Sequence, residues 1–120
     1  MKYLWTTMSV KNLEESIGFY ENVVGMKLQR RFEAGPGAEI AFMEFEEDGT
    51  KIELMCQADF KGQPKGMSLS LGFATADVRK KLEEVQGKGY EASPIISPNP
   101  QTQFFFIQDP DGIDIQFVQE

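Results

Sequence analysis

One pattern of residues occurs twice in this chain of 120 residues, as DPDGIDIQF at 109–117 and as EEDGTKIEL at 46–54. In both copies an Asp-Gly pair precedes an alternation of apolar and polar residues, and Asp111 lies 63 positions after Asp48. An Asp-Gly pair between alternating runs is typical of a turn that joins two antiparallel strands. The repeat therefore predicts two similar modules, each of which ends in a hairpin.

The first half has the pattern of a β-α-β-β-β module. Asn12 is a candidate helix cap with Glu15 three residues later, and Gly25 marks the end of the helix. The apolar residues between them recur at the spacing of one helix face. That face consists of Leu13, Ile17, Tyr20 and Val24, and the expected strands lie at 2–10, 26–33, 40–47 and 50–56.

The second half repeats the order of the first after a linker at 57–66, which contains one Pro, two Gly and no periodicity. Either Thr75 or Asp77 caps the expected helix, and either Gly87 or Gly89 ends it. The apolar face of that helix is Val78, Leu82 and Val85, the expected strands lie at 67–73, 90–96, 102–109 and 113–120, and a Pro-rich loop lies at 97–102.

The interval between matching positions is not constant. It is 63 between the last strands, where Glu53 matches Gln116, and 65 between the helices, where Leu13 matches Val78. We expect 63 to hold at the first strands as well, so that Trp5 matches Ser68. A compensated insertion and deletion explains a change that is confined to the helices.

Length and charge limit the class of protein. A length of 120 residues suits one domain, with module one at 1–56 and module two at 67–120. The net charge of −7 disfavours a nucleic-acid partner, and no apolar run is long enough to span a membrane. The N-terminal segment lacks an apolar signal-peptide core, and the lone Cys56 forms no internal disulfide, so we expect a cytoplasmic protein.

The chain contains no histidine. Histidine is the most common general base, the usual partner of a catalytic Ser or Cys, and the most common nitrogen ligand of zinc, nickel or iron. Any enzyme reaction must therefore use carboxylates, Tyr, Lys or Cys56, and Cys56 has no evident base beside it.

Two stretches resemble one known family. LEESIGFYENVVGMKL at 13–28 and FIQDPDGIDIQFVQE at 106–120 are similar to the first helix and the closing hairpin of the glyoxalase/bleomycin-resistance (vicinal oxygen chelate) superfamily. The resemblance covers nearly the whole chain. It implies an α+β fold in which two tandem βαβββ modules form a cupped mixed sheet around one cavity, and it also implies a homodimer.

The resemblance implies a site but not its usual metal. The metal enzymes of this family place two His and two Glu on the first and last strands of the two modules. The matching residues here are Trp5, Glu53, Ser68 and Gln116. Only Glu53 remains as a strong ligand, because Ser and Gln are weak neutral ligands and an indole offers only a donor hydrogen. We therefore expect no metal and no cofactor.

Strand alternation extends this set of side chains. Residues two positions away share a face of the strand, and the positions between them pack against the helix. Trp5 is expected either to stack on a ligand or to pack in the core, and Glu53 either to contact a ligand or to pair with Lys51. The predicted ligand-binding residues are Trp5, Thr7, Glu53, Met55, Ser68, Ser70, Asp114 and Gln116.

Three hypotheses for function follow. The first is a metal-independent protein that binds and sequesters a flat or cationic small molecule, because polar groups beside an aromatic suit a wet ligand cavity. The second is a lactoylglutathione lyase-like or isomerase-type enzyme in which Glu53 is the base. The third is a dimeric interaction module with an empty cup.

Overall fold

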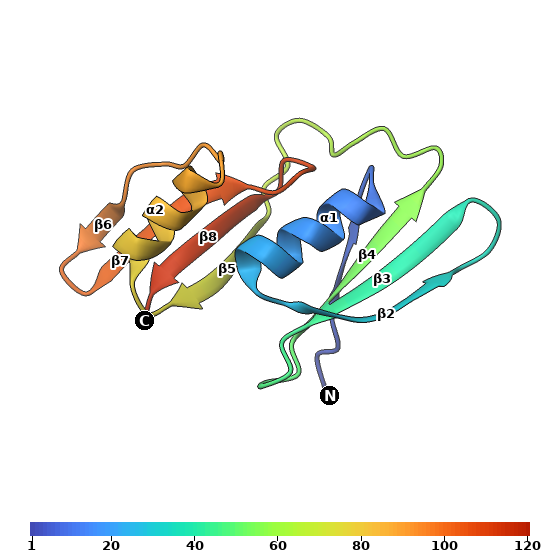
Figure 1. Ribbon diagram of the computed structural model, residues 1–120, viewed down its shortest axis with the longest axis horizontal. Coiled ribbons are helices and arrows are strands. Elements are labelled where there is room, and N and C mark those ends of the chain that lie inside the picture. The colour runs from blue at the N-terminus through green and yellow to red at the C-terminus, as the bar shows by residue number, and fades with distance from the viewer. The chain divides into compact units, whose positions relative to one another are not determined.

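The computed structural model describes residues 1–120, in two compact units: Met1–Pro64, here unit 1, and Lys65–Glu120, here unit 2. The boundary between the units lies inside the predicted linker. Each unit contains one four-stranded mixed sheet, with the orders β1-β4-β3-β2 and β5-β8-β7-β6, and one helix, as the repeat predicts. In both units the first strand is parallel to the last strand, and the remaining neighbours are antiparallel (Figure 1).

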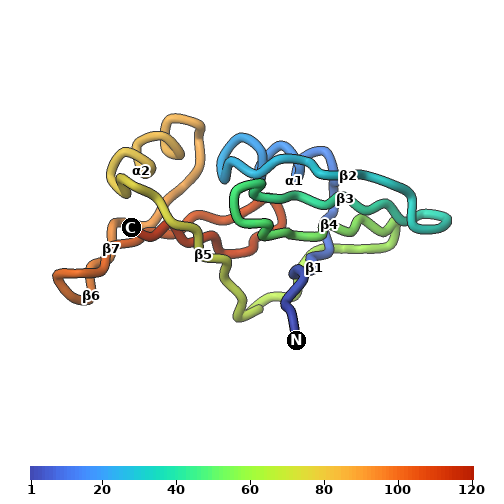
Figure 2. Tube along the Cα trace, turned by 90° about the horizontal axis from the view of Figure 1, so that it is seen from below, coloured from blue at the N-terminus to red at the C-terminus, as the bar shows by residue number.

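The strands of unit 1 are β1 (Thr6–Ser9), β2 (Lys27–Glu33), β3 (Ala38–Glu44) and β4 (Lys51–Gln57). Helix α1 (Leu13–Phe19) continues into a π turn, η1 (Tyr20–Val24), and lies on one side of this sheet (Figure 2). The Asn12 side chain accepts a hydrogen bond of 3.0 Å from the Glu15 amide, so the predicted cap is confirmed. Gly25 ends the helix in the left-handed region with φ 91°.

Buried apolar side chains fill the space between α1 and its sheet. Leu13, Ile17 and Tyr20 are buried as the helical spacing predicts, and Val23 is buried in place of Val24. Met8, Val10, Ala41, Met43, Ile52 and Leu54 form the sheet side of this core.

The strands of unit 2 are β5 (Ser70–Thr75), β6 (Ile96–Asn99), β7 (Thr102–Gln108) and β8 (Asp114–Gln119). Of the two predicted caps for α2 (Val78–Gly87), Asp77 is the correct one, because its side chain accepts a hydrogen bond of 3.0 Å from the Lys80 amide. Gly89 has φ 92° just after the helix. Val78, Val85, Phe105, Ile107, Ile113, Ile115 and Phe117 form the core.

The prediction for 90–102 is wrong in its position. Most of the expected strand at 90–96 is a segment that touches β7 through Ser93, and β6 begins at Ile96 and continues into the expected loop. Pro98 lies inside this edge strand, where a missing amide hydrogen is tolerated. Pro98, which favours a loop in the sequence, therefore lies in the edge strand of the sheet.

Both Asp-Gly pairs lie in the connection between the last two strands, as predicted. Gly49 has φ 73° and Gly112 has φ 85°, a conformation that favours glycine. The first connection runs from 45 to 50 and the second from 109 to 113, so the second is one residue shorter.

Candidate functional site

Four side chains form a row on the face of the unit 1 sheet that α1 does not cover. The register places Thr7 beside Glu53, Glu53 beside Phe42, and Phe42 beside Arg30. We call this set the unit 1 row and this side of the sheet the helix-free face. The row runs across all four strands and combines a hydroxyl, a carboxylate, an aromatic ring and a guanidinium.

Trp5 lies next to this row, one residue before β1. Its ring meets the Phe42 ring edge-on, with centroids 5.0 Å apart and an angle of 78° between planes. Trp5 is half-buried, whereas Phe42 is 2% exposed. The indole therefore belongs neither to the closed core nor to the free surface.

Thr7 and Glu53 contact each other directly. The Thr7 hydroxyl donates a hydrogen bond to Glu53 Oε1. Met55 lies two residues after Glu53 on the same strand and is half-buried. The intervening Ile52 and Leu54 are 4% and 0% exposed, which confirms the predicted alternation along β4.

Sequence reasoning missed Arg30 and Phe32. The guanidinium carbon of Arg30 lies 4.7 Å from the centroid of Phe42 and 5.1 Å from that of Phe32. The two phenyl rings stack with centroids 6.3 Å apart. This cation lies on the same face as Glu53, whereas the predicted ligand-binding residues include two carboxylates, Glu53 and Asp114, and no cation.

Unit 2 has a matching row on the face that α2 does not cover. Gly72 lies beside Gln116, and Gln116 lies beside Phe106. A Cβ atom added to Gly72 would lie 3.7 Å from Gln116 Oε1, so the amide group of Gln116 lies above the glycine. Thr7 fills the equivalent place in unit 1 and donates a hydrogen bond to Glu53 there.

The register corrects the predicted interval at the first strands. Thr7 pairs with Glu53 and Gly72 pairs with Gln116, so the interval is 65 there, and Trp5 matches Ser70. Ser68 lies before β5 and is exposed. Leu4 and Leu69, expected to pack behind these residues, are 56% and 40% exposed because the strands begin after them.

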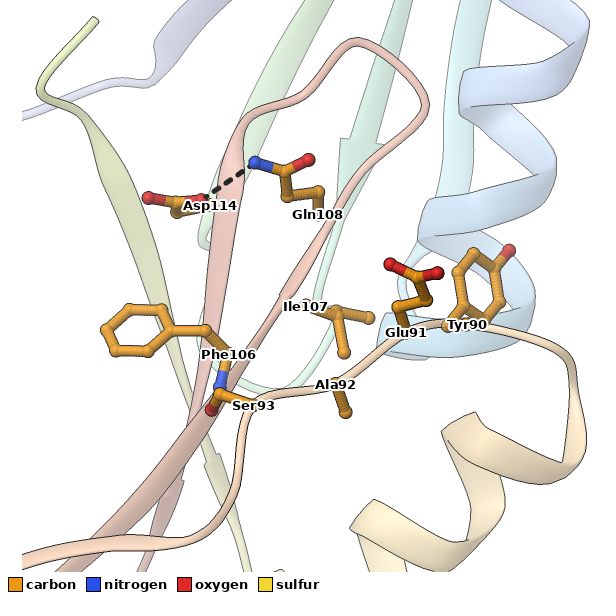
Figure 3. Close-up of a pocket in the computed structure, with 8 residues that line it drawn as sticks. All are labelled: Tyr90, Glu91, Ala92, Ser93, Phe106, Ile107, Gln108 and Asp114. Atoms are coloured by element: carbon orange, nitrogen blue, oxygen red, sulfur yellow. Dashed lines mark hydrogen bonds between the residues drawn. The ribbon is translucent and has the colours of Figure 1, made fainter. Parts of the chain in front are cut away.

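Ser70 and Asp114 form the next row of unit 2 together with Gln108. The Gln108 amide donates a hydrogen bond of 3.4 Å to Asp114 Oδ1. Both residues line an open pocket with a volume of about 340 Å³ (Figure 3). Tyr90, Glu91, Ala92 and Ser93 from the segment after α2 line it as well, with Phe106 and Ile107.

The residues at the four family positions do not fit a transition metal. No group of three His, Cys, Asp or Glu residues is arranged to hold a metal ion within either unit. The Trp5 indole packs on Phe42 and has no lone pair to give, and Glu53 already accepts a hydrogen bond from Thr7. A divalent metal needs several anionic or imidazole donors at about 2.0–2.2 Å.

A family model for the glyoxalase/bleomycin resistance protein/dioxygenase superfamily matches residues 2–117. This chain belongs to that superfamily. The match confirms the resemblance that the helix at 13–28 and the closing hairpin suggest. No helix in the structure is both long and apolar enough to cross a membrane.

Individual members of the superfamily are similar over most of the chain. A lactoylglutathione lyase of Neisseria meningitidis is 34% identical over 128 residues, covering 100% of this chain and 91% of that protein. Glyoxalase I from Zea mays is 27% identical with a TM-score of 0.84, and the matched region covers 98% of this chain and 44% of that chain. A glyoxalase family protein from Enterococcus faecalis has a TM-score of 0.83 at 15% identity, with 98% and 97% of the chains covered.

Proposed function

We propose that this member of the superfamily binds a small molecule without a metal and sequesters it. The supporting observation is the unit 1 row with Trp5 beside it. A sheet face that packed only against protein would leave Glu53 to be satisfied by Thr7 alone, and burying an under-satisfied carboxylate is costly. Polar groups among aromatic rings are the usual lining of a ligand site.

Metal independence is the part of this proposal that separates the chain from lactoylglutathione lyases. In the metal enzymes of the superfamily the metal acts as a Lewis acid on the developing oxyanion. Trp5, Ser70 and Gln116 replace three of its four ligands here. Elemental analysis of the purified protein tests the proposal, with no stoichiometric nickel or zinc as the expected result.

The ligand is proposed to be flat rather than simply cationic. An indole edge-on to Phe42 presents part of its surface for stacking, and such contacts contribute about 0.5–1.5 kcal/mol beyond area burial. A cation would gain from Glu53 but would meet Arg30 on the same face. The guanidinium therefore weighs against a purely cationic ligand.

A screen by thermal shift tests ligand binding directly. Flat aromatic compounds with neutral, cationic and anionic substituents, antibiotics among them, are compared with wild type and with Trp5→Ala. A true ligand at 100 times its dissociation constant stabilises wild type by about 2.7 kcal/mol. Leu4→Ala is the matched control, because this neighbouring side chain is 56% exposed. An equal response of wild type and Trp5→Ala would contradict a site at Trp5.

The alternative is an enzyme in which Glu53 is the base. Two observations favour it: the similarity to proteins named lactoylglutathione lyase, and the direct hydrogen bond that orients Glu53. Turnover of hemithioacetals, lost in Glu53→Gln but kept in Asp114→Asn, would support the enzyme. Ligand binding without turnover would support sequestration.

We also propose that the protein works in the cytoplasm as a homodimer. The cytoplasmic location is proposed because Cys56 is the lone cysteine, and the homodimer because the chain resembles the superfamily. Cys56 is half-buried, and its thiol lies 3.6 Å from the Lys11 carbonyl oxygen, which fits a packing role.

A further inference from the structure

Arg30 reaches the helix-free face of unit 1 because of a β-bulge. Leu28 pairs with Met43 and Arg30 pairs with Phe42, so Gln29 is an extra residue in β2. In a regular strand Gln29 would stand opposite Phe42, and Arg30 would stand opposite Ala41 on the side of α1. A bulge of this kind redirects the side chains that follow it.

The neighbouring Arg31 shows what an arginine does on the other side of the same strand. It lies opposite Ala41, forms an ion pair with Glu14 of α1, and donates to Glu39 Oε2 over 2.6 Å. Arg30 forms no ion pair and is exposed. One arginine is thus neutralised by the protein, whereas the other lies against two aromatic rings without an anion.

Stacking on aromatic rings prepares a guanidinium for an anion. The group is planar, its N–H bonds lie in its own plane, and rings above or below leave those edges free. The rings also restrict the side chain before binding, which reduces the entropy lost on binding. Two parallel N–H bonds match the two oxygens of a carboxylate.

The position of Arg30 in the row defines the rest of the ligand. Phe42 is only 2% exposed, and both Trp5 and Arg30 pack on it. Arg30 and Glu53 flank Phe42 on the adjacent strands, so their backbones are two strand spacings, about 10 Å, apart. An anionic end at Arg30 and a planar group at Trp5 are thus compatible in one small molecule.

We propose that the ligand of this face is a planar carboxylate. Arg30 binds its carboxylate through two N–H···O bonds, Trp5 contacts its planar part, and Glu53 accepts a hydrogen bond from any donor at its far end. This inference rests on the proposed small-molecule function and specifies the chemical class. If Arg30 instead only shields Phe42, its replacement will change stability and leave ligand preference unchanged.

Three pairs of compounds test the proposal, each a carboxylate and its uncharged amide: benzoate and benzamide, cinnamate and cinnamamide, indole-3-acetate and indole-3-acetamide. They are titrated at pH 7 into the full ¹⁵N-labelled chain. The indole N–H signal of Trp5, the only tryptophan, and the Arg30 Nε–H signal report binding. The variants are Arg30→Gln, Arg30→Lys and, as a control with the same charge change in unit 2, the exposed Arg79→Gln.

At least one carboxylate is expected to bind tenfold or more tightly than its amide and to shift both signals. Arg30→Gln should abolish that preference, Arg30→Lys should keep only part of it, and Arg79→Gln should keep all of it. Equal binding of acid and amide, or the same preference in Arg30→Gln and Arg79→Gln, would overturn the carboxylate but leave the proposed function standing. No saturable shift of the Trp5 signal by any of the six compounds would overturn both.

Discussion

Trp5 offers the most direct test at the scale of single residues. Its indole is half-buried and packs on Phe42, so acrylamide should quench its emission in the free protein, and a bound ligand should reduce that quenching. Trp5→Ala should weaken ligand binding by about 1–3 kcal/mol, which is the scale of a lost aromatic contact. Emission that resists acrylamide without ligand, together with about 3–5 kcal/mol of lost stability in Trp5→Ala, would show a core residue instead.

The family positions make a second prediction possible. The variant Trp5→His/Ser70→His/Gln116→Glu supplies two imidazoles and a carboxylate at three family positions and should gain micromolar or tighter affinity for nickel or zinc by calorimetry. The matched control places the second histidine at Ser68, which the structure puts before β5. Equal affinities of the two triple variants would contradict the register-based match between Trp5 and Ser70.

Sequence alternation placed most candidate residues on a common face but could not place all of them. The alternation that puts Thr7, Glu53 and Met55 on one face is predictable because β1 and β4 are regular strands. Ser68 was chosen from a constant interval, which fails because the interval is 65 at the first strands. Arg30 was missed because nothing in KLQRRFE shows where the extra residue of β2 lies.

At the scale of elements, the closing hairpin depends on Asp109. This residue is 5% exposed, and its Oδ1 accepts hydrogen bonds of 2.9 Å from the amides of Asp111 and Ile113. Asp109→Ala leaves two buried amides without acceptors. It should lower the free energy of unfolding, measured in urea, by about 2–4 kcal/mol. Asp48→Ala in the first hairpin is the control with a smaller cost, since Asp48, which accepts a hydrogen bond of 2.9 Å from the Thr50 amide, is exposed. Equal losses of stability in Asp109→Ala and Asp48→Ala would contradict the larger contribution of Asp109.

The ion pair between β2 and β3 predicts a dependence on pH. Hydrogen bonds from Arg31 hold the pKa of Glu39 below its ordinary value of 4.5. A lowered pKa in the folded state means a contribution to stability that is present above about pH 4.5 and is lost as pH falls through the folded value. Glu39→Gln should therefore lower the free energy of unfolding at pH 7, and the difference from wild type should disappear at low pH. In the Arg31→Gln background the same change should have no further effect, and an unchanged difference there would argue against the pair.

The elements themselves were predictable wherever local signals agreed. Asn12, Asp77 and the two Asp-Gly pairs satisfy specific backbone amides or adopt φ values that glycine favours, so they fix helix starts and turns locally. The segment 90–102 lacked such a signal. Its strand is short, lies at the edge and contains Pro98, so tertiary pairing with β7 decides where it begins.

At the scale of the whole molecule, the superfamily resemblance predicts a dimer. Sedimentation equilibrium should give twice the chain mass of 13.6 kDa at micromolar concentration. Raising the salt concentration should favour association, because each chain has a net charge of −7 and the two chains repel each other. A mass of one chain at every concentration and salt level would show that the functional unit is a monomer.

The bulge at Gln29 shifts the alternation of side chains along β2 by one residue. Side chains before it keep one phase of the two-residue alternation, and Arg30, Arg31 and Phe32 after it keep the other. Deleting that single residue would leave Arg30 opposite Phe42 in a regular strand, whereas regular pairing of a retained Gln29 would turn Arg30 toward α1 and move Arg31 away from Glu14. A homologous chain without the extra residue would therefore keep the Arg30 guanidinium on this face, and one that paired Gln29 regularly would display Gln29 and Arg31 there instead.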